Sequence, residues 1–263
     1  MDLGLYGRGA LVGGASAGLG RACAERLASE GCRLALWSRG GEALDRAAEQ
    51  IRDTHKVEVT TIAADATDPA AAAQVATAAR RALGRVEIVV LNAGGPPTVE
   101  STKTDPNVWR RSFQLLAITP IELTTLLLPP MRTHGWGRVV SILSSGVRQP
   151  IPELSYSNAC RSALMAWLKT ISVEVMADGV TVNGVLPGRL DTERVATLDR
   201  MKAERMGTTA EGVRAVMERG IPAGRYGHPD ELGAYVAWLC SDRARYQTGT
   251  FVSIDGGSMT TLP

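Results

Sequence analysis

The chain has 263 residues, of which 44% are hydrophobic and 21% charged, as in a soluble globular domain with a substantial core. Its formal net charge of +2 gives no basis for a nucleic-acid or membrane-surface partner. The four cysteines are scattered without metal-type spacing, so we expect reduced thiols, no metal site and a cytoplasmic location. The longest apolar run, Leu126–Pro130, is too short to cross a bilayer.

Short apolar runs alternate with helical patterns along the chain. In chain order, the predicted strands are Ala10–Val12, Arg33–Trp37, Val57–Ala63, Val86–Leu91, Arg138–Leu143, Thr181–Leu186 and Thr250–Ile254. The predicted helices are Arg21–Glu30, Glu42–Thr54, Ala70–Leu83, Pro106–Thr133, Asn158–Met176 and Pro229–Cys240. Uninterrupted apolar strands that alternate with helices predict an α/β fold: a doubly wound, Rossmann-type parallel sheet of about seven strands, forming a single domain over residues 1–263.

One segment, Asp191–Ile221, lies outside this alternation. It is helical in pattern, charged and rich in methionine. Two interpretations remain open: a mobile lid over a binding site, or a pair of surface helices with a methionine-lined inner face.

A glycine-rich stretch follows the first strand and precedes the first helix. Glycines in that position let the backbone approach a pyrophosphate, and the N–H groups at the helix start favour its negative charge. We therefore expect this stretch to bind a dinucleotide through Gly14, Ser16, Gly18, Leu19 and Gly20.

The end of the second strand indicates which dinucleotide is preferred. An acidic side chain there would bind the adenosine ribose hydroxyls and favour NAD(H). This chain has Ser38 and Arg39 instead, and both can donate to a 2′-phosphate. The sequence therefore predicts NADP(H) as the preferred cofactor.

Further motifs complete a pattern that covers almost the whole chain. They are Asp65 after the third strand, Asn92-Ala93-Gly94 after the fourth, Asn183, Pro187-Gly188 and Thr192 around the sixth, and Val252–Gly257 near the end. With the glycine spacing, this pattern resembles the short-chain dehydrogenase/reductase superfamily, and Gly220–Arg225 resembles its 3-oxoacyl-carrier-protein reductase branch.

The resemblance implies where these motifs contact the cofactor. Asp65 would lie by the adenine, and Asn92, Ala93 and Gly94 would line the adenosine side. The nicotinamide would be bordered by Pro187, Gly188 and Thr192. The family also implies a small-molecule substrate and a homodimer or homotetramer, here through Trp109–Leu128 and Leu154–Val175.

The catalytic residues depart from the family pattern. The resemblance implies a tyrosine that moves the proton, a lysine four residues later that lowers the pKa of the tyrosine, an orienting serine, and an asparagine that holds a relay water. Ser144 fits the serine, with Ser145 as a close second, but the asparagine position holds Leu116.

Two registers are open for the tyrosine and the lysine. In the first, Tyr156 is the tyrosine and Cys160 stands at the lysine position, where a neutral thiol supplies no cation. The second counts thirteen residues from Ser144 and places Ser157 and Arg161 at the two positions. We favour the second, because the downstream motifs then follow without a gap.

These residues predict an atypical oxidoreductase. Tyr156 is the preferred proton donor because an aliphatic hydroxyl such as that of Ser157 is far less acidic than a phenol. Ser144 would orient the carbonyl, while Arg161 would supply the charge and bind the nicotinamide ribose. The alternatives are a non-redox enzyme on the same fold and a catalytically silent NADP(H)-binding protein.

Substrate contacts are predicted near the same site. Arg148, Gln149 and Glu153 lie on the loop between the serine and the tyrosine, where a solvated loop is the alternative. Arg189 could bind a carboxylate or phosphate. Its alternative role is an ion pair with a nearby acid, Asp191 or Glu193.

Overall fold

A seven-stranded parallel sheet runs through the computed structural model, which describes residues 1–261. The strand order is β3-β2-β1-β4-β5-β6-β7, so the sequence-based prediction of a doubly wound fold is confirmed. The strands are β1 (Gly9–Gly13), β2 (Arg33–Ser38), β3 (Val59–Ala63), β4 (Ile88–Leu91), β5 (Gly137–Ile142), β6 (Val180–Pro187) and β7 (Phe251–Ile254).

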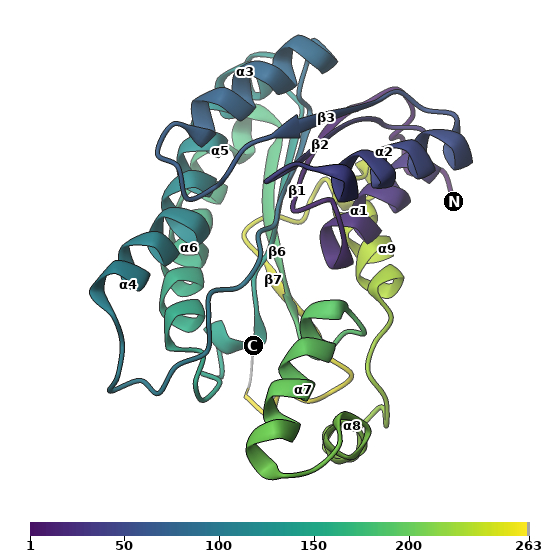
Figure 1. The fold of residues 1–263 in the computed structure, drawn as a ribbon. Helices are drawn as coiled ribbons and strands as arrows, with labels where there is room; N and C mark the ends of the chain where they lie inside the picture. The colour runs from purple at the N-terminus through teal and green to yellow at the C-terminus, as the bar shows by residue number, and fades with distance from the viewer. Residues whose placement is uncertain (262–263) are drawn as a thin grey trace.

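Helices cover both faces of the sheet (Figure 1). One face carries α1 (Gly18–Ser29), α2 (Glu42–His55) and α9 (Pro229–Leu239). The other carries α3 (Ala71–Leu83), α5 (Thr119–Thr133) and α6 (Ser155–Glu174).

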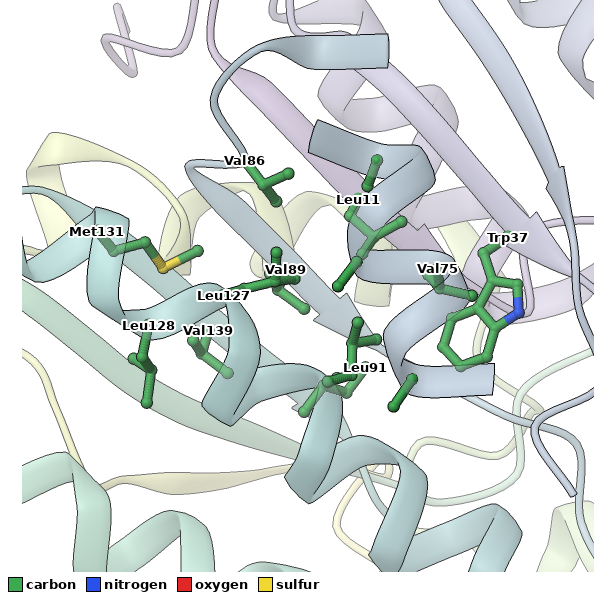
Figure 2. Close-up of a cluster of buried hydrophobic side chains, with 14 of the residues drawn as sticks. Leu11, Trp37, Val75, Val86, Val89, Leu91, Leu127, Leu128, Met131 and Val139 are labelled. Carbon is green, nitrogen blue, oxygen red and sulfur yellow. The ribbon is translucent and has the colours of Figure 1, made fainter. Parts of the chain in front are cut away.

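Side chains alternate between the two cores along each strand. In β1, Leu11 joins the core under α3 and α5, while Ala10 and Val12 join the core under α1. Figure 2 shows Leu11 in the first of these cores together with Leu127 and Met131 of α5. Burying one such large side chain contributes about 1.5–3 kcal/mol, and the two cores hold the carboxyl ends of the strands in a fixed arrangement.

The predicted long helix over 106–133 is present, but it is not α-helical throughout. It runs continuously through α4 (Pro106–Phe113), a π-helical turn η1 (Gln114–Ile118) and α5. By length and composition alone this stretch is apolar enough to cross a membrane, but 44% of its most apolar 18 residues are buried in the fold. Its buried side chains belong to the core beside the sheet, as expected for a core helix.

Helix α6 begins at Ser155, three residues before the predicted start, so Tyr156 lies inside its first turn rather than before it. Its buried stripe follows helical spacing through Ser157, Arg161, Leu164 and Leu168. The polar pair is therefore the N-terminal continuation of the face that packs on the sheet.

The segment after β6 forms two helices, α7 (Glu193–Met206) and α8 (Ala210–Arg219), which confirms its predicted helical character. They lie beyond the carboxyl end of β6, apart from the two helical layers (Figure 1). The predicted methionine-lined inner face is wrong for Met201 and Met206, which are 41% and 61% exposed.

Candidate active site

The glycine-rich loop lies between β1 and α1, where the strand order reverses. Gly14 and Gly18 both have φ of +58°, a conformation that side chains rarely adopt. The start of α1 has no side-chain cap, since its N-cap is Ala17. Its first N–H groups can therefore bind an anion, and Ser16 and Leu19 lie half-buried on the same loop.

Close packing fixes the shape of this loop. A Cβ added to Gly20 would lie 2.4 Å from the Gly14 carbonyl oxygen and 2.6 Å from that of Gly13. Asn92 Nδ2 donates to the Gly13 carbonyl at 3.2 Å, which ties the ends of β1 and β4 together. A Cβ added to Gly94 would meet nothing within 4 Å, so a ligand has room there.

The predicted adenosine residues gather at the ends of β2 and β3. Ser38 Oγ accepts a hydrogen bond from the Gly40 N–H at 3.2 Å, and the adjacent Arg39 is exposed. The Asp65 carboxylate accepts from the Thr67 N–H at 2.9 Å. That hydrogen bond is the largest cause of a lowered pKa for Asp65, and the nearby Arg39 charge contributes.

The segment after β6 reaches the glycine loop from the opposite side. Pro187 ends β6, and the Gly188 N–H donates to the Ile254 carbonyl at 3.0 Å. The Thr192 methyl carbon would lie 3.7 Å from a Cβ added to Gly18. Thr192 thus lies beside the glycine loop, and this arrangement fits a dinucleotide held between the loop and the end of β6.

Arg161 is the centre of the predicted catalytic residues. Its guanidinium is buried and donates to the Ile142 carbonyl at 2.9 Å, the Ala93 carbonyl at 3.2 Å and Ser157 Oγ at 3.2 Å. Burial lowers its pKa to about 10, so the side chain stays charged at neutral pH. The residue that the second register assigns to the lysine position is thus a buried cation in contact with Ser157.

Cys160 does not share this environment. Its thiol is buried, and burial raises its pKa to about 11. A neutral buried thiol supplies neither a cation nor a base at pH 7. The contacts of Arg161 and Cys160 therefore both favour the register that was based on spacing.

Ser144 lies at the end of β5, close to the start of α6. Its Oγ accepts from the Gly146 N–H at 3.1 Å and caps the short 3-10 turn η2 (Ser145–Val147). The hydroxyl hydrogen is not used in that bond, so Ser144 retains a donor for a ligand.

Tyr156 points to another part of the molecule. Its hydroxyl accepts from the Asp105 N–H at 2.7 Å, at the N-cap of α4. Its ring packs edge-on against Trp109, with the ring centroids 4.7 Å apart. The structure thus brings Ser157 and Arg161 together but engages the Tyr156 hydroxyl at α4, which disagrees with Tyr156 as the preferred proton donor.

Leu116 lies in the π-helical turn η1 and is 2% exposed. A leucine side chain has no group that could hold a water, and here it packs in the interior.

The predicted substrate residues have different surroundings. Arg148 donates to the Phe251 carbonyl at 2.8 Å, and Gln149 is exposed. Glu153, with φ of +64°, forms an ion pair with Arg205 of α7, whose Nη1 lies 2.7 and 2.8 Å from the two carboxylate oxygens. This ion pair joins the loop before α6 to α7.

Arg189 forms an ion pair, but not with either acid predicted from the sequence. Its Nη1 lies 2.6 Å from a carboxylate oxygen of Asp199, which is 4% exposed. Tyr226 donates to the same carboxylate at 2.8 Å. Arg189 therefore anchors α7 to the end of β6. A further arginine, Arg194 on the first turn of α7, donates to the Pro96 carbonyl at 2.9 Å beside the same site. The sequence did not single it out because no motif marks it.

Residues 14–259 match the family model described as enoyl-(acyl carrier protein) reductase. The 3-oxoacyl-(acyl-carrier-protein) reductase of Salmonella typhimurium is 30% identical over 95% of this chain and 97% of its own length. D-beta-hydroxybutyrate dehydrogenase of Rhizobium meliloti is 30% identical over 94% of this chain and 97% of its own. The crystal structure of L-sorbose reductase from Gluconobacter frateurii, complexed with NADPH and L-sorbose, is similar with a TM-score of 0.95 at 30% identity, covering 100% of both chains.

Proposed function

This chain belongs to the short-chain dehydrogenase/reductase superfamily, and we propose that it is an NADP(H)-dependent oxidoreductase that interconverts a carbonyl and an alcohol of a small molecule. The observation that carries the proposal is the buried Arg161 guanidinium beside Ser157 and the Ala93 carbonyl. Burying a charge without a counter-ion is costly, and such a charge is useful where negative charge develops during a reaction.

Ser144, Ser157 and Arg161 have separate roles in the proposed reaction. Bound NADPH supplies a hydride to the carbonyl carbon. Ser157 Oγ accepts from Arg161 Nε, so its own hydrogen is available for the substrate oxygen, which takes up the proton. Arg161 Nε, 3.2 Å from Ser157 Oγ, stabilises the negative charge left on that hydroxyl oxygen, which lowers the pKa of an otherwise weakly acidic group, and solvent restores the proton of Ser157. Ser144 donates to the same oxygen and orients the carbonyl.

In this account Tyr156 has a positioning role. Its hydroxyl satisfies the Asp105 N–H, and its ring supports Trp109, so it fixes the start of α4. Replacing it by phenylalanine removes one hydrogen bond, which costs about 0.5–1.5 kcal/mol of stability and leaves the reacting groups in place.

The test is NADPH oxidation with a panel of ketones, oxo acids and 3-oxoacyl thioesters. We expect steady-state turnover on at least one class, a kcat about tenfold or more lower in Ser157→Ala, and a kcat within about threefold of wild type in Tyr156→Phe. NADPH binding with no turnover on any substrate would instead favour the silent binding protein. A large loss in Tyr156→Phe alone would return the proton donor to Tyr156.

The proposal includes a preference for NADP(H) over NAD(H). Arg39 is exposed beside Ser38 and makes no ion pair within residues 1–261, so its guanidinium is available to a 2′-phosphate. Asp65 stands nearby. L-sorbose reductase, which binds NADPH, supports the proposal by similarity.

Arg39→Asp is expected to reverse this preference. Loss of a charge-assisted hydrogen bond and gain of a repulsive carboxylate should weaken NADPH binding by about 10–100-fold, while NADH binding is unchanged or tighter. Dissociation constants from nucleotide fluorescence measure this. Equal weakening of both nucleotides would show that Arg39 does not contact the 2′-phosphate, and Arg46→Asp on the exposed face of α2 is the charge-matched control.

We also propose a homodimer or homotetramer in the cytoplasm. Four large apolar side chains on the surfaces of α4–α5 and α6 are 37–74% exposed, which supports an interface there: Phe113, Ile118, Leu126 and Val173. The four cysteines are free and buried, which suits a reducing compartment. Light scattering that gives the mass of one chain, 27.9 kDa, would contradict the oligomer.

A further inference from the structure

A second arginine reaches the loop that Arg161 holds. Arg194, on the first turn of α7, donates through Nη2 to the Pro96 carbonyl at 2.9 Å. The same atom would lie 3.2 Å from a Cβ added to Gly95. Since Arg161 donates to the Ala93 carbonyl at 3.2 Å, two guanidinium groups are bound to one four-residue loop.

The acids nearby are already paired with other arginines. Asp191 pairs with Arg214, Glu193 with Arg200, Asp199 with Arg189, and Glu153 with Arg205. Within residues 1–261, neither Arg161 nor Arg194 has a carboxylate within 4.0 Å. The loop therefore carries two positive charges that the described part of the chain does not neutralise.

The two charges affect each other. Burial is the main cause of the lowered Arg161 pKa, and the positive charge of Arg194 acts in the same direction. An anion between them would relieve this repulsion and gain charge-assisted hydrogen bonds. Arg194 is also exposed enough to be reached by a ligand.

We propose that the substrate is an anionic oxo acid whose carboxylate is bound by Arg194, with Arg161 adding attraction from the catalytic side. The inference rests on the proposed reductase function and names its substrate class. Among the described residues only Nη2 of the Arg194 side chain donates, so its guanidinium can still present N–H donors to a planar carboxylate, while Arg161 contributes by its charge. A phosphate has similar chemistry, and the diphosphate of the cofactor is a second source of such a group.

Matched substrate pairs test the proposal. Acetoacetate and pyruvate would be compared with their methyl esters, which keep the reacting carbonyl and remove the charge. Wild type should have a kcat/KM at least about tenfold higher for the acids. Arg194→Met should remove most of that preference by raising KM for the acids alone, and Arg194→Lys should restore part of it.

A binding measurement separates substrate from cofactor. The NADPH dissociation constant of Arg194→Met, from nucleotide fluorescence, should stay within about threefold of wild type. A tenfold weakening with an unchanged acid preference would assign Arg194 to the cofactor diphosphate and overturn the proposal. Lys202→Met removes the same charge from the same helix without unpairing an acid of residues 1–261, and it should keep the preference for acids.

Different results would overturn the anionic substrate and the reductase function. Wild-type enzyme that reduces esters and acids equally well would overturn the anionic substrate and leave the reductase function standing. No NADPH oxidation with any carbonyl would overturn the reductase function itself.

Discussion

Arg161→Met is expected to lower kcat/KM by at least about 100-fold, because it removes the buried cation that stabilises the negative charge on Ser157 when its proton moves to the substrate oxygen. The variant also loses three hydrogen bonds and leaves the Ala93 and Ile142 carbonyls unpaired. An unpaired buried carbonyl costs about 1–3 kcal/mol, so the unfolding free energy should fall as well.

Two measurements distinguish these effects. Denaturant unfolding gives the loss of stability, and single-turnover kinetics at saturating NADPH gives the loss of the chemical step. Arg161→Lys is the matched control, since it keeps a positive charge but presents fewer donors. It should retain more activity than Arg161→Met. Wild-type kinetics in a folded Arg161→Met protein would exclude a catalytic role for this guanidinium.

Gly20→Ala is expected to have the second largest effect. Its Cβ would lie 2.4 and 2.6 Å from two backbone carbonyl oxygens, which cannot move without distorting the loop. Overpacking of this kind costs about 1–3 kcal/mol, and the distortion should weaken NADPH binding by at least about tenfold. Thermal unfolding and NADPH titration measure the two effects.

Two other glycines provide controls for Gly20→Ala. In Gly220→Ala the added Cβ would lie 3.4 Å from the nearest atom, the Met217 carbonyl oxygen, which is an ordinary contact, so stability and NADPH binding should be nearly unchanged. Gly94→Ala adds a Cβ in open space, so it should fold normally and weaken NADPH binding only if the cofactor fills that space. Normal NADPH binding in a folded Gly20→Ala would contradict the role given to this loop.

Local pattern explains what the sequence predicted well. The seven buried strands, the helical segment after β6 and the glycine loop follow from apolar runs, helical spacing and glycines at a strand–helix junction. Strand ends differ from the predictions by only a few residues; β3, for example, begins at Val59 rather than Val57. Such ends depend on pairing with neighbouring strands, which no single segment encodes.

The orientation of Tyr156 was not predictable from the sequence. It depends on a hydrogen bond to Asp105, 51 residues away, and on packing against Trp109. The same limit applies to Arg189, whose buried partner Asp199 lies ten residues on, beyond the two acids nearest in sequence. The four-residue spacing did predict that Ser157 and Arg161 lie together, since residues i and i+4 share one face of a helix.

Arg194, the proposed substrate-binding residue, shows why such a residue can lack any sequence signal. Its importance comes from the loop that it contacts 98 residues earlier and from nearby acids that pair with other arginines. No local motif indicates that a charge lacks a counter-ion. One feature of the sequence could have indicated Arg194: it lies two positions after Thr192, on a helix that begins beside the cofactor loop.

The central claim is hydride transfer from NADPH to a carbonyl at the Ser144, Ser157 and Arg161 site. The most direct measurement uses NADPH that carries deuterium at nicotinamide C4, with mass spectrometry of the product. We expect stereospecific labelling: one C4 epimer gives an alcohol with one carbon-bound deuterium for each NADPH oxidised, and the other gives unlabelled alcohol. Product formed without NADPH oxidation, or unlabelled product from both epimers, would contradict the claim.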